Sequence, residues 1–281
     1  MLPRVAQICP ICAGTSLASL TALDLAYLRC DGCGSLSLPP SSSPPSQVGS
    51  DPPSVERAKE AVYRSGLEWL ETLSPPDRIL DVGAGNGGFL AAALARGWTP
   101  SGVEPDASAA ERARSLGLQV VTGDLSDLSG AGAPFAAITL WDSLDMLPDP
   151  LQGLVKVREL LRAGGLVLVR VRNPEVHLLM RRWLGGLSAR VPSLAPTFHR
   201  FGISARGLRV LFGRAGLAAV EVRNSAMTEG DPYSKDIGFR QLAVASVKAS
   251  ASAAAWIAAA ASGGRCLLGT SLIAVARRPA A

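Results

Sequence analysis

The chain has 281 residues, a formal charge of +5 and 48% hydrophobic residues. This apolar content is enough for a large core, so a disordered or collagen-like protein is excluded. The mean hydropathy of +0.24 is high, yet no window holds the ~18–20 strongly apolar residues that a bilayer span requires. Residues 244–262 come nearest, and they are expected to form an ordinary helix. The first residues lack the pattern of a secretory signal, so we expect a cytoplasmic protein without a membrane span.

Two pairs of cysteines stand near the start of the chain. Cys9 with Cys12, and Cys30 with Cys33, each enclose two residues, and seventeen residues separate the pairs. This spacing is typical of a four-thiolate zinc site, which is structural because no coordination position stays open. An iron site and a redox pair or disulfides are the alternatives. Residues 1–38 are therefore expected to be a zinc ribbon, whose small core would need the metal to fold.

The rest of the chain divides into a linker and one large domain. Residues 39–53 hold six prolines and five serines, a composition typical of a linker. Within residues 54–281, helices are expected at 55–73, 89–96, 107–116, 151–161 and 204–215. Strands are expected at 78–82, 101–104, 118–122, 135–141, 166–171, 217–223 and 271–276. This alternation predicts an α/β fold with a doubly wound, mostly parallel Rossmann-like sheet and an antiparallel edge hairpin from the last two strands.

A glycine-rich loop follows the first expected strand of the large domain. Asp81 lies near the end of that strand, and Gly83, Gly85 and Gly87 follow at intervals of two residues. Glycines let the backbone approach a ligand, and the next helix offers free N–H donors at its start. Dinucleotide-binding folds also have such a loop, but their G-x-G-x-x-G spacing differs. Glu104 ends the next strand, where a carboxylate is placed to accept hydrogen bonds from ribose hydroxyls.

These residues resemble class I S-adenosylmethionine-dependent methyltransferases, most clearly over residues 78–172. The resemblance implies that Asp81 reaches the amino group of the methionine part and that Glu104 holds the ribose. It places Asp124 at the adenine amine and Leu125 as a backbone donor beside it. The full set that it implies for S-adenosylmethionine is Asp81, Gly83, Ala84, Gly85, Asn86, Gly87, Glu104, Pro105, Asp124, Leu125, Trp141 and Asp142. A nicotinamide or flavin site is the alternative.

The candidate catalytic residues are fewer. Many relatives carry a histidine where this chain has Met146, so the chemistry of that histidine does not transfer. A base is needed only if the acceptor is protonated at rest. His199 lies where the chain is expected to cover the acceptor, and it is the candidate base or orienting residue, with a structural histidine as the alternative. Asp145 is the second catalytic candidate, whereas His177 is expected to be structural.

A zinc ribbon, a linker and this core together resemble a bacterial group of methyltransferases that act on nucleotide-linked sugars or in polysaccharide and natural-product pathways. Between Lys156 and Arg214, twelve basic residues meet two acidic ones, so this stretch carries +10 and the rest of the chain −5. Arg170, Arg172 and Arg200 are candidates to hold a phosphate or carboxylate. The sequence thus predicts a small, anionic or nucleotide-linked acceptor, with a solvated basic face that has no specific partner as the alternative for this stretch. An rRNA or tRNA base methyltransferase and a non-catalytic cofactor-binding scaffold are the alternatives.

Overall fold

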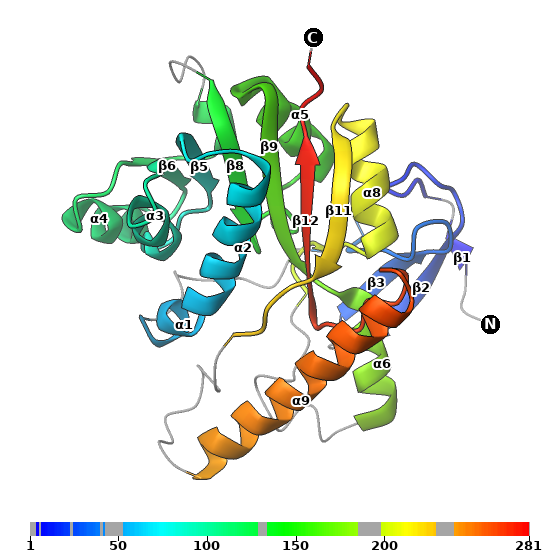
Figure 1. The fold of residues 1–281 in the computed structure, drawn as a ribbon. Helices are drawn as coiled ribbons and strands as arrows, with labels where there is room; N and C mark the ends of the chain where they lie inside the picture. The colour runs from blue at the N-terminus through cyan, green and yellow to red at the C-terminus, as the bar shows by residue number, and fades with distance from the viewer. Residues whose placement is uncertain are drawn as a thin grey trace.

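The fold is organised by two sheets. The computed structural model describes residues 4–5, 7–22, 25–39, 42, 53–128, 134–184, 198–228 and 239–280. One sheet has seven strands and the other, smaller sheet has five (Figure 1). Most of the expected linker, residues 39–53, lies outside the described residues.

The large sheet confirms the predicted α/β class. Its strands are β5 (Arg78–Val82), β6 (Thr99–Glu104), β7 (Val120–Thr122), β8 (Phe135–Trp141), β9 (Leu161–Arg172), β11 (Ala218–Asn224) and β12 (Ser271–Arg277). Their order across the sheet is β11-β12-β9-β8-β5-β6-β7. The neighbours from β9 to β7 pair in parallel, whereas β12 is antiparallel to both β9 and β11. The edge strand β11 and its neighbour β12 therefore form the expected antiparallel pair.

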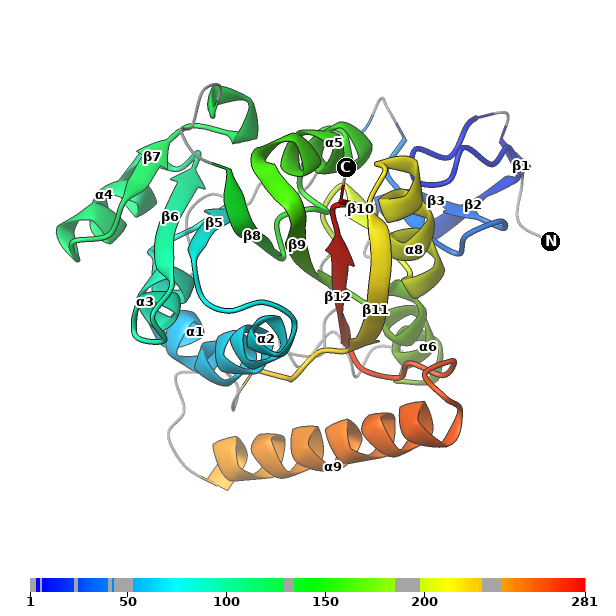
Figure 2. The same cartoon turned by 45° about the horizontal axis from the view of Figure 1, so that its top comes forward.

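Helices lie on both faces of this sheet and beyond one of its edges (Figures 1 and 2). They are α1 (Pro53–Ala58), α2 (Glu60–Leu73), α3 (Gly88–Leu94), α4 (Ala107–Ser115), α5 (Pro150–Leu160), α6 (Pro174–Leu184), α8 (Ala205–Arg214) and α9 (Phe239–Ala261), with the 3-10 turn η1 (Leu125–Asp127). The helix expected at 55–73 is divided between α1 and α2 by a turn at Lys59. None of the described helices is long and apolar enough to cross a membrane.

Two apolar layers form because both faces of the sheet are covered. Val167 and Val169 of β9 join the layer that contains Leu211 of α8. Leu166 and Leu168, which alternate with them, join the layer on the side of α2. Successive side chains of a strand point to opposite faces, so a parallel strand between two helical layers is apolar at every position.

The cysteine-bearing segment forms the small sheet beside α8 (Figure 2). Its own strands are β1 (Arg4–Val5), β2 (Leu17–Ala22), β3 (Leu25–Cys30) and β4 (Leu36–Ser37). The fifth strand, β10 (Phe201–Gly202), comes from the far part of the chain and pairs antiparallel with β4. The ribbon and the large domain therefore share one sheet as well as one apolar core, in which Ile11 packs with residues of α8.

Candidate functional site

The parallel strands bring the expected cofactor residues to one edge of the large sheet. β5 lies between β8 and β6, and Asp81 is in register with Thr139 on one side and Gly102 on the other. Glu104 ends β6 and Trp141 ends β8. Ligands in open α/β sheets bind at the carboxyl ends of the strands, so this edge is the candidate site.

The glycine loop has the backbone shape that its sequence predicts. Gly83, Gly85 and Gly87 have φ angles of 81°, 53° and 87°, in the left-handed region that favours glycine. The backbone N–H groups of Gly83 and Ala84 donate to the carbonyl oxygen of Val103, at 2.8 and 3.1 Å. Gly87 stands directly before α3, so the loop delivers the chain to a helix N-terminus at the edge of the sheet.

Glu104 is tied to this loop. Its Oε2 accepts the backbone N–H of Gly85 at 2.7 Å, and its Oε1 accepts that of Asp106 at 2.9 Å. Pro105, between them, is exposed. Each carboxylate oxygen keeps a second lone pair, so Glu104 has acceptor capacity left for a ligand while it holds the loop in place.

Asp81 is a buried carboxyl group at the centre of the site. Its side chain is 2% exposed, and its Oδ1 accepts the hydroxyl of Thr139 at 2.7 Å. Burial raises the pKa of Asp81 well above its ordinary value, and the negative charges of Glu56 and Glu104 raise it further. The surroundings of Asp81 therefore favour a positively charged ligand, which would relieve the repulsion among these carboxylates.

The structure adds residues of α1 and α2 that the sequence patterns did not single out. A Cβ on Gly88 would overlap the Glu56 carboxylate, so Glu56 lies against the start of α3. The hydroxyl of Tyr63 donates to Glu56 Oε2 at 3.2 Å. The positive charge of Lys59 opposes the rise in the pKa of Asp81 but does not cancel it. The sequence signalled this segment only as an apolar helix, because its polar positions carry no motif.

The residues expected at the adenine side are more open. Asp124 is exposed and caps η1, with its Oδ1 accepting the backbone N–H of Ser126 at 2.7 Å. The hydrogen bonds from Ser126 lower the pKa of Asp124, so it is an ionised acceptor at neutral pH. Leu125 is buried beside it. Asn86 accepts a hydrogen bond from Arg112 at 2.7 Å, which holds the loop to α4.

Trp141 points its ring into the layer on the side of α2. The ring lies 5.2 Å from that of Tyr63 and 5.3 Å from that of Phe89, and its indole N–H has no partner. Gly66 of α2 is required here, because a Cβ at that position would overlap the indole. Trp141 thus packs under the edge of the site through its ring, while the chain that follows it remains at the edge.

Asp142 forms a buried ion pair with Arg170. Its φ of 55° is in the left-handed region, and its Oδ2 accepts a hydrogen bond from Arg170. Burial works to raise the pKa of Asp142, but the charges of Arg170 and Lys59 outweigh it and lower the pKa. The other guanidinium nitrogens of Arg170 donate to Ser225 and Ser271. Each nitrogen of Arg170 thus donates one hydrogen bond within the protein, while Nη1 and Nη2 each keep a second N–H, and its role in holding a phosphate or carboxylate stays a prediction.

The two catalytic candidates lie on segments that touch. The backbone N–H of Phe201 donates to the carbonyl oxygen of Asp145 at 3.2 Å. Asp145 is 2% exposed and His199 is 5% exposed. Met146, beside Asp145, is about half exposed. The chain after β8 and the chain before β10 therefore meet at the carboxyl edge of the sheet.

Unsatisfied polar atoms occur on the segments that lead to this meeting point. Among the described residues, five buried side-chain atoms have no hydrogen-bond partner: Trp141 Nε1, Asp142 Oδ1, Asp145 Oδ1, His177 Nδ1 and Arg200 Nε. All belong to the chain that follows β8 or β9, to the end of β8, or to the segment before β10. Buried polar groups are nearly always bonded, so such a concentration indicates a place for a polar ligand or ordered water.

His177 makes a structural contact of the kind that its sequence suggests. Its Nε2 lies 3.0 Å from the carbonyl oxygen of Thr270, which can only accept, so Nε2 carries the proton and Nδ1 is the free acceptor. Burial and the charge of Arg172 lower the pKa of His177 to about 4, and the ring is neutral at physiological pH. The bond to Thr270 confirms a structural contact, while the other nitrogen remains unpartnered.

Asp145 is expected to make the stability of the protein fall as the pH rises towards 8. Burial and the charge of Asp142 raise the pKa of Asp145 to about 8 from an ordinary 3.8. A group whose pKa is raised by folding stabilises the protein fully below its unfolded value, and loses that contribution as the pH passes its folded value. Urea unfolding of the wild type and Asp145→Asn at several pH values between 4 and 9 tests this. The variant should lose this downward slope, and an equal slope in both would contradict the assignment.

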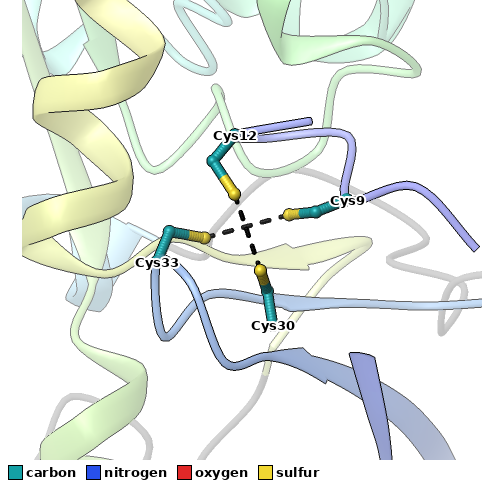
Figure 3. Close-up of side chains that lie close together, drawn as sticks. All are labelled: Cys9, Cys12, Cys30 and Cys33. Atoms are coloured by element: carbon teal, nitrogen blue, oxygen red, sulfur yellow. Dashed lines mark hydrogen bonds between the residues drawn. The ribbon is translucent and has the colours of Figure 1, made fainter. Parts of the chain in front are cut away.

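The four ribbon cysteines form one cluster. The Sγ atoms all lie within 4.8 Å of one another, with Cys9 and Cys33 at 3.8 Å and Cys12 and Cys30 at 3.5 Å. Figure 3 shows them pointing at a common centre from two turns. A tetrahedral zinc ion with Zn–S bonds of about 2.3 Å separates its sulfurs by about 3.8 Å. The cysteines are free thiols and three of them are buried, so the donor set fits a four-thiolate metal site.

Comparisons with known proteins agree with the fold described above. A family model described as a methyltransferase domain matches residues 55–222. The magnesium protoporphyrin IX methyltransferase of Synechocystis PCC 6803, solved with bound SAH, is 13% identical, with a TM-score of 0.53 over 80% of this chain and 85% of that one. A chain from the Haloferax volcanii complex of the Trm112 methyltransferase activator is 16% identical, with a TM-score of 0.52 over 80% and 93%. A comparison with curated proteins gave no match.

Proposed function

The chain belongs to the methyltransferase domain family and is an S-adenosylmethionine-dependent methyltransferase, and we propose that it methylates a small acceptor that carries an anionic group. A nucleotide-linked sugar, a polysaccharide precursor or a natural-product intermediate would meet this description. The observation that carries the proposal is the buried, unpartnered Nε of Arg200, beside His199 in the chain and accompanied by the unpartnered oxygen of Asp145. A guanidinium group favours phosphate or carboxylate, and a free carboxyl oxygen favours a hydroxyl.

The cofactor half of the proposal rests on the glycine loop and its carboxylates. S-adenosylmethionine supplies a methyl group already activated on a sulfonium. The buried Asp81 would accept a hydrogen bond from its amino group. Glu104 would accept hydrogen bonds from the ribose hydroxyls while it holds the loop. The protein then mainly has to orient the acceptor and exclude water, because the displacement itself needs little help. His199 and Asp145 are the residues that we propose for orienting the acceptor or moving its proton.

The basic stretch supports a small acceptor better than RNA. Several of its arginines are engaged within the protein: Arg170 with Asp142, Arg162 with Asp77 and Arg214 with ribbon carbonyl groups. An RNA-binding surface needs many free cations to neutralise phosphates. The formal +10 of the stretch therefore does not amount to a continuous phosphate-binding surface.

We also propose that the cysteine cluster holds a structural Zn²⁺. Four thiolates fill all positions of a tetrahedral site, so the ion would have no position left for a substrate. The backbone N–H of Gly14 donates to Cys12 Sγ at 3.4 Å, and a Cβ on Gly14 would lie 3.2 Å from the same sulfur. Such a close backbone approach suits a metal-binding turn and stabilises the thiolate form.

Replacing Glu104 by alanine is expected to abolish the thermal stabilisation that S-adenosylmethionine gives the wild type. The change removes the proposed ribose acceptor and the anchor of Gly85 together. At a concentration about 100 times its Kd, a ligand stabilises the folded state by about 2.7 kcal/mol, which is readily seen as a shift in Tm. The measurement is thermal unfolding with and without the cofactor. Glu111→Ala removes the same side-chain atoms from an exposed glutamate on α4, and this control should keep the full shift.

The same assay examines the acceptor. With S-adenosylhomocysteine present, uridine diphosphate glucose should raise the Tm further as a nucleotide-linked probe, and a structured RNA hairpin should not. No shift of the wild type with S-adenosylmethionine would overturn the cofactor assignment. A shift with the RNA alone would overturn the proposal of a small acceptor and favour a nucleic-acid substrate.

A further inference from the structure

The ribbon holds the segment that carries His199 in a backbone ladder. β10 pairs with β4 of the ribbon, and the backbone N–H of Leu38 donates to the carbonyl oxygen of Arg200 at 3.0 Å. On its other side, the N–H of Phe201 donates to the carbonyl oxygen of Asp145 at 3.2 Å. The chain at 200–201 therefore bridges the ribbon and the loop that follows β8.

Tyr27 of the ribbon holds the residues just before this bridge. Its side chain is fully buried, and its hydroxyl lies 3.0 Å from the carbonyl oxygen of Phe198 and 3.1 Å from that of His199. Carbonyl groups only accept, so one phenolic proton is shared between two successive peptides. Burial and the charge of Asp145 raise the pKa of Tyr27 to about 12, so the hydroxyl remains a donor throughout the physiological range.

Ring contacts link the same tyrosine, through Phe198, to His177 of α6. The Phe198 ring meets the Tyr27 ring edge to face at 6.0 Å, and the His177 ring in the same manner at 5.7 Å. Phe198 is thus held between the ribbon and the histidine whose Nδ1 has no partner. A shift of Phe198 would move the surroundings of both histidines, because close-packed interiors transmit displacement.

We propose that Tyr27 is a positioning residue through which the zinc ribbon sets the acceptor half of the site. It holds the backbone of Phe198 and His199, and with β4 it fixes the chain at 198–201 beside the loop that contains Asp145. The inference rests on the proposed function only where it assigns His199 and Asp145 to the acceptor. The contacts themselves do not depend on that assignment.

The arrangement gives the metal site a consequence beyond its own segment. Tyr27 lies on β3, which ends at Cys30, and the Ser204 hydroxyl that caps α8 donates to the carbonyl oxygen of Cys33. Loss of structure in the cysteine turns is therefore expected to disturb the segment between Phe198 and α8. The backbone N–H groups of Gly83, Ala84 and Gly85 donate instead to Val103 and Glu104 of β6, so the cofactor half should be independent of the ribbon.

The test is Tyr27→Phe, which keeps the ring and removes only the hydroxyl. Hydrogen–deuterium exchange of peptides that cover 198–204 should speed up by about fivefold, the factor expected for the net loss of one buried hydrogen bond. Peptides that cover 83–88 should be unchanged. Tyr63→Phe is the matched control, because it also removes one buried hydroxyl donor, but from the cofactor side. It should leave 198–204 unchanged.

A second readout separates positioning from general destabilisation. The chain has two histidines, so the ring signals of histidine-labelled protein are few enough to assign by His177→Gln and His199→Gln. Tyr27→Phe should shift the His199 signal and, through Phe198, the His177 signal, whereas Tyr63→Phe should shift neither. In Tyr27→Phe, the zinc content and the Tm shift with S-adenosylmethionine should match those of the wild type.

Unchanged exchange at 198–204 together with unchanged histidine signals would overturn the inference, even if the cofactor binds as proposed. Loss of the cofactor shift in the wild type would instead overturn the proposed function and leave the exchange result standing. If Tyr27→Phe does not fold, the wild type is compared with and without a chelator. Faster exchange at 198–204 but not at 83–88 supports the inference, and equal protection at 198–204 overturns it.

Discussion

Replacing Arg170 by leucine is expected to destabilise the protein by about 3–5 kcal/mol, because it leaves a buried charge without its partner. The side chains of Arg170 and Asp142 are only 8% and 14% exposed. The change also removes the N–H groups that donate to the hydroxyl oxygens of Ser225 and Ser271. Urea unfolding at neutral pH measures the loss as a lower midpoint with little change in slope.

Two further variants show whether the buried charge is the cause. Arg170→Leu combined with Asp142→Asn should be more stable than Arg170→Leu alone, since the second change removes the uncompensated carboxylate. Arg162→Leu removes the same kind of side chain from an exposed pair with Asp77, where the two side chains are 42% and 47% exposed, and should cost less than about 1 kcal/mol. Equal losses in Arg170→Leu and Arg162→Leu would contradict the importance of burial.

Removal of the metal is expected to have the largest effect on the small sheet. Structural zinc sites bind with apparent free energies of about 10–16 kcal/mol in zinc-finger peptides, and most of that is folding free energy. Cys30→Ser should therefore lose bound zinc and lower the Tm, while thermal stabilisation by S-adenosylmethionine is retained. Metal analysis and thermal unfolding of the same samples measure both.

Cys266→Ser is the matched control for this experiment. Cys266 is exposed and lies outside the cluster, so the same atom exchange there should change neither zinc content nor Tm. A wild type that binds well under one equivalent of zinc, or a Cys30→Ser protein that keeps its metal, would contradict the four-thiolate site. Loss of cofactor stabilisation in Cys30→Ser would show that the two halves of the site are coupled, against the independence argued above.

Local patterns in the chain were sufficient for the framework of the cofactor side. The spacing of Gly83, Gly85 and Gly87 predicts a loop that only glycine accommodates easily, and all three have positive φ. The alternation of apolar strands and helices predicts the sheet, and its parallel pairing then brings Asp81 and Glu104 to one edge. These features depend on neighbours in the sequence, so a single chain reveals them.

The cysteine cluster could also be predicted, because two C-x-x-C turns have a strong geometric requirement. What the spacing could not show is where the ribbon rests. β10 has two residues and no pattern of its own, and it exists because β4 offers an open edge to it. Tyr27 likewise becomes informative only when the carbonyl groups of Phe198 and His199 lie within reach of its hydroxyl.

The charged residues show the same division most clearly. Summed along the chain, the stretch from Lys156 to Arg214 has a charge of +10 and suggests an anionic partner. In the fold, Arg170 is paired with Asp142, which lies 28 positions earlier, and Arg214 with the carbonyl groups of the ribbon. Backbone shape and apolar periodicity are local properties, and the sequence was enough to predict them. The partner of a charge or a hydroxyl is chosen by distance in space, and only the tertiary structure decided which side chains remain for the acceptor.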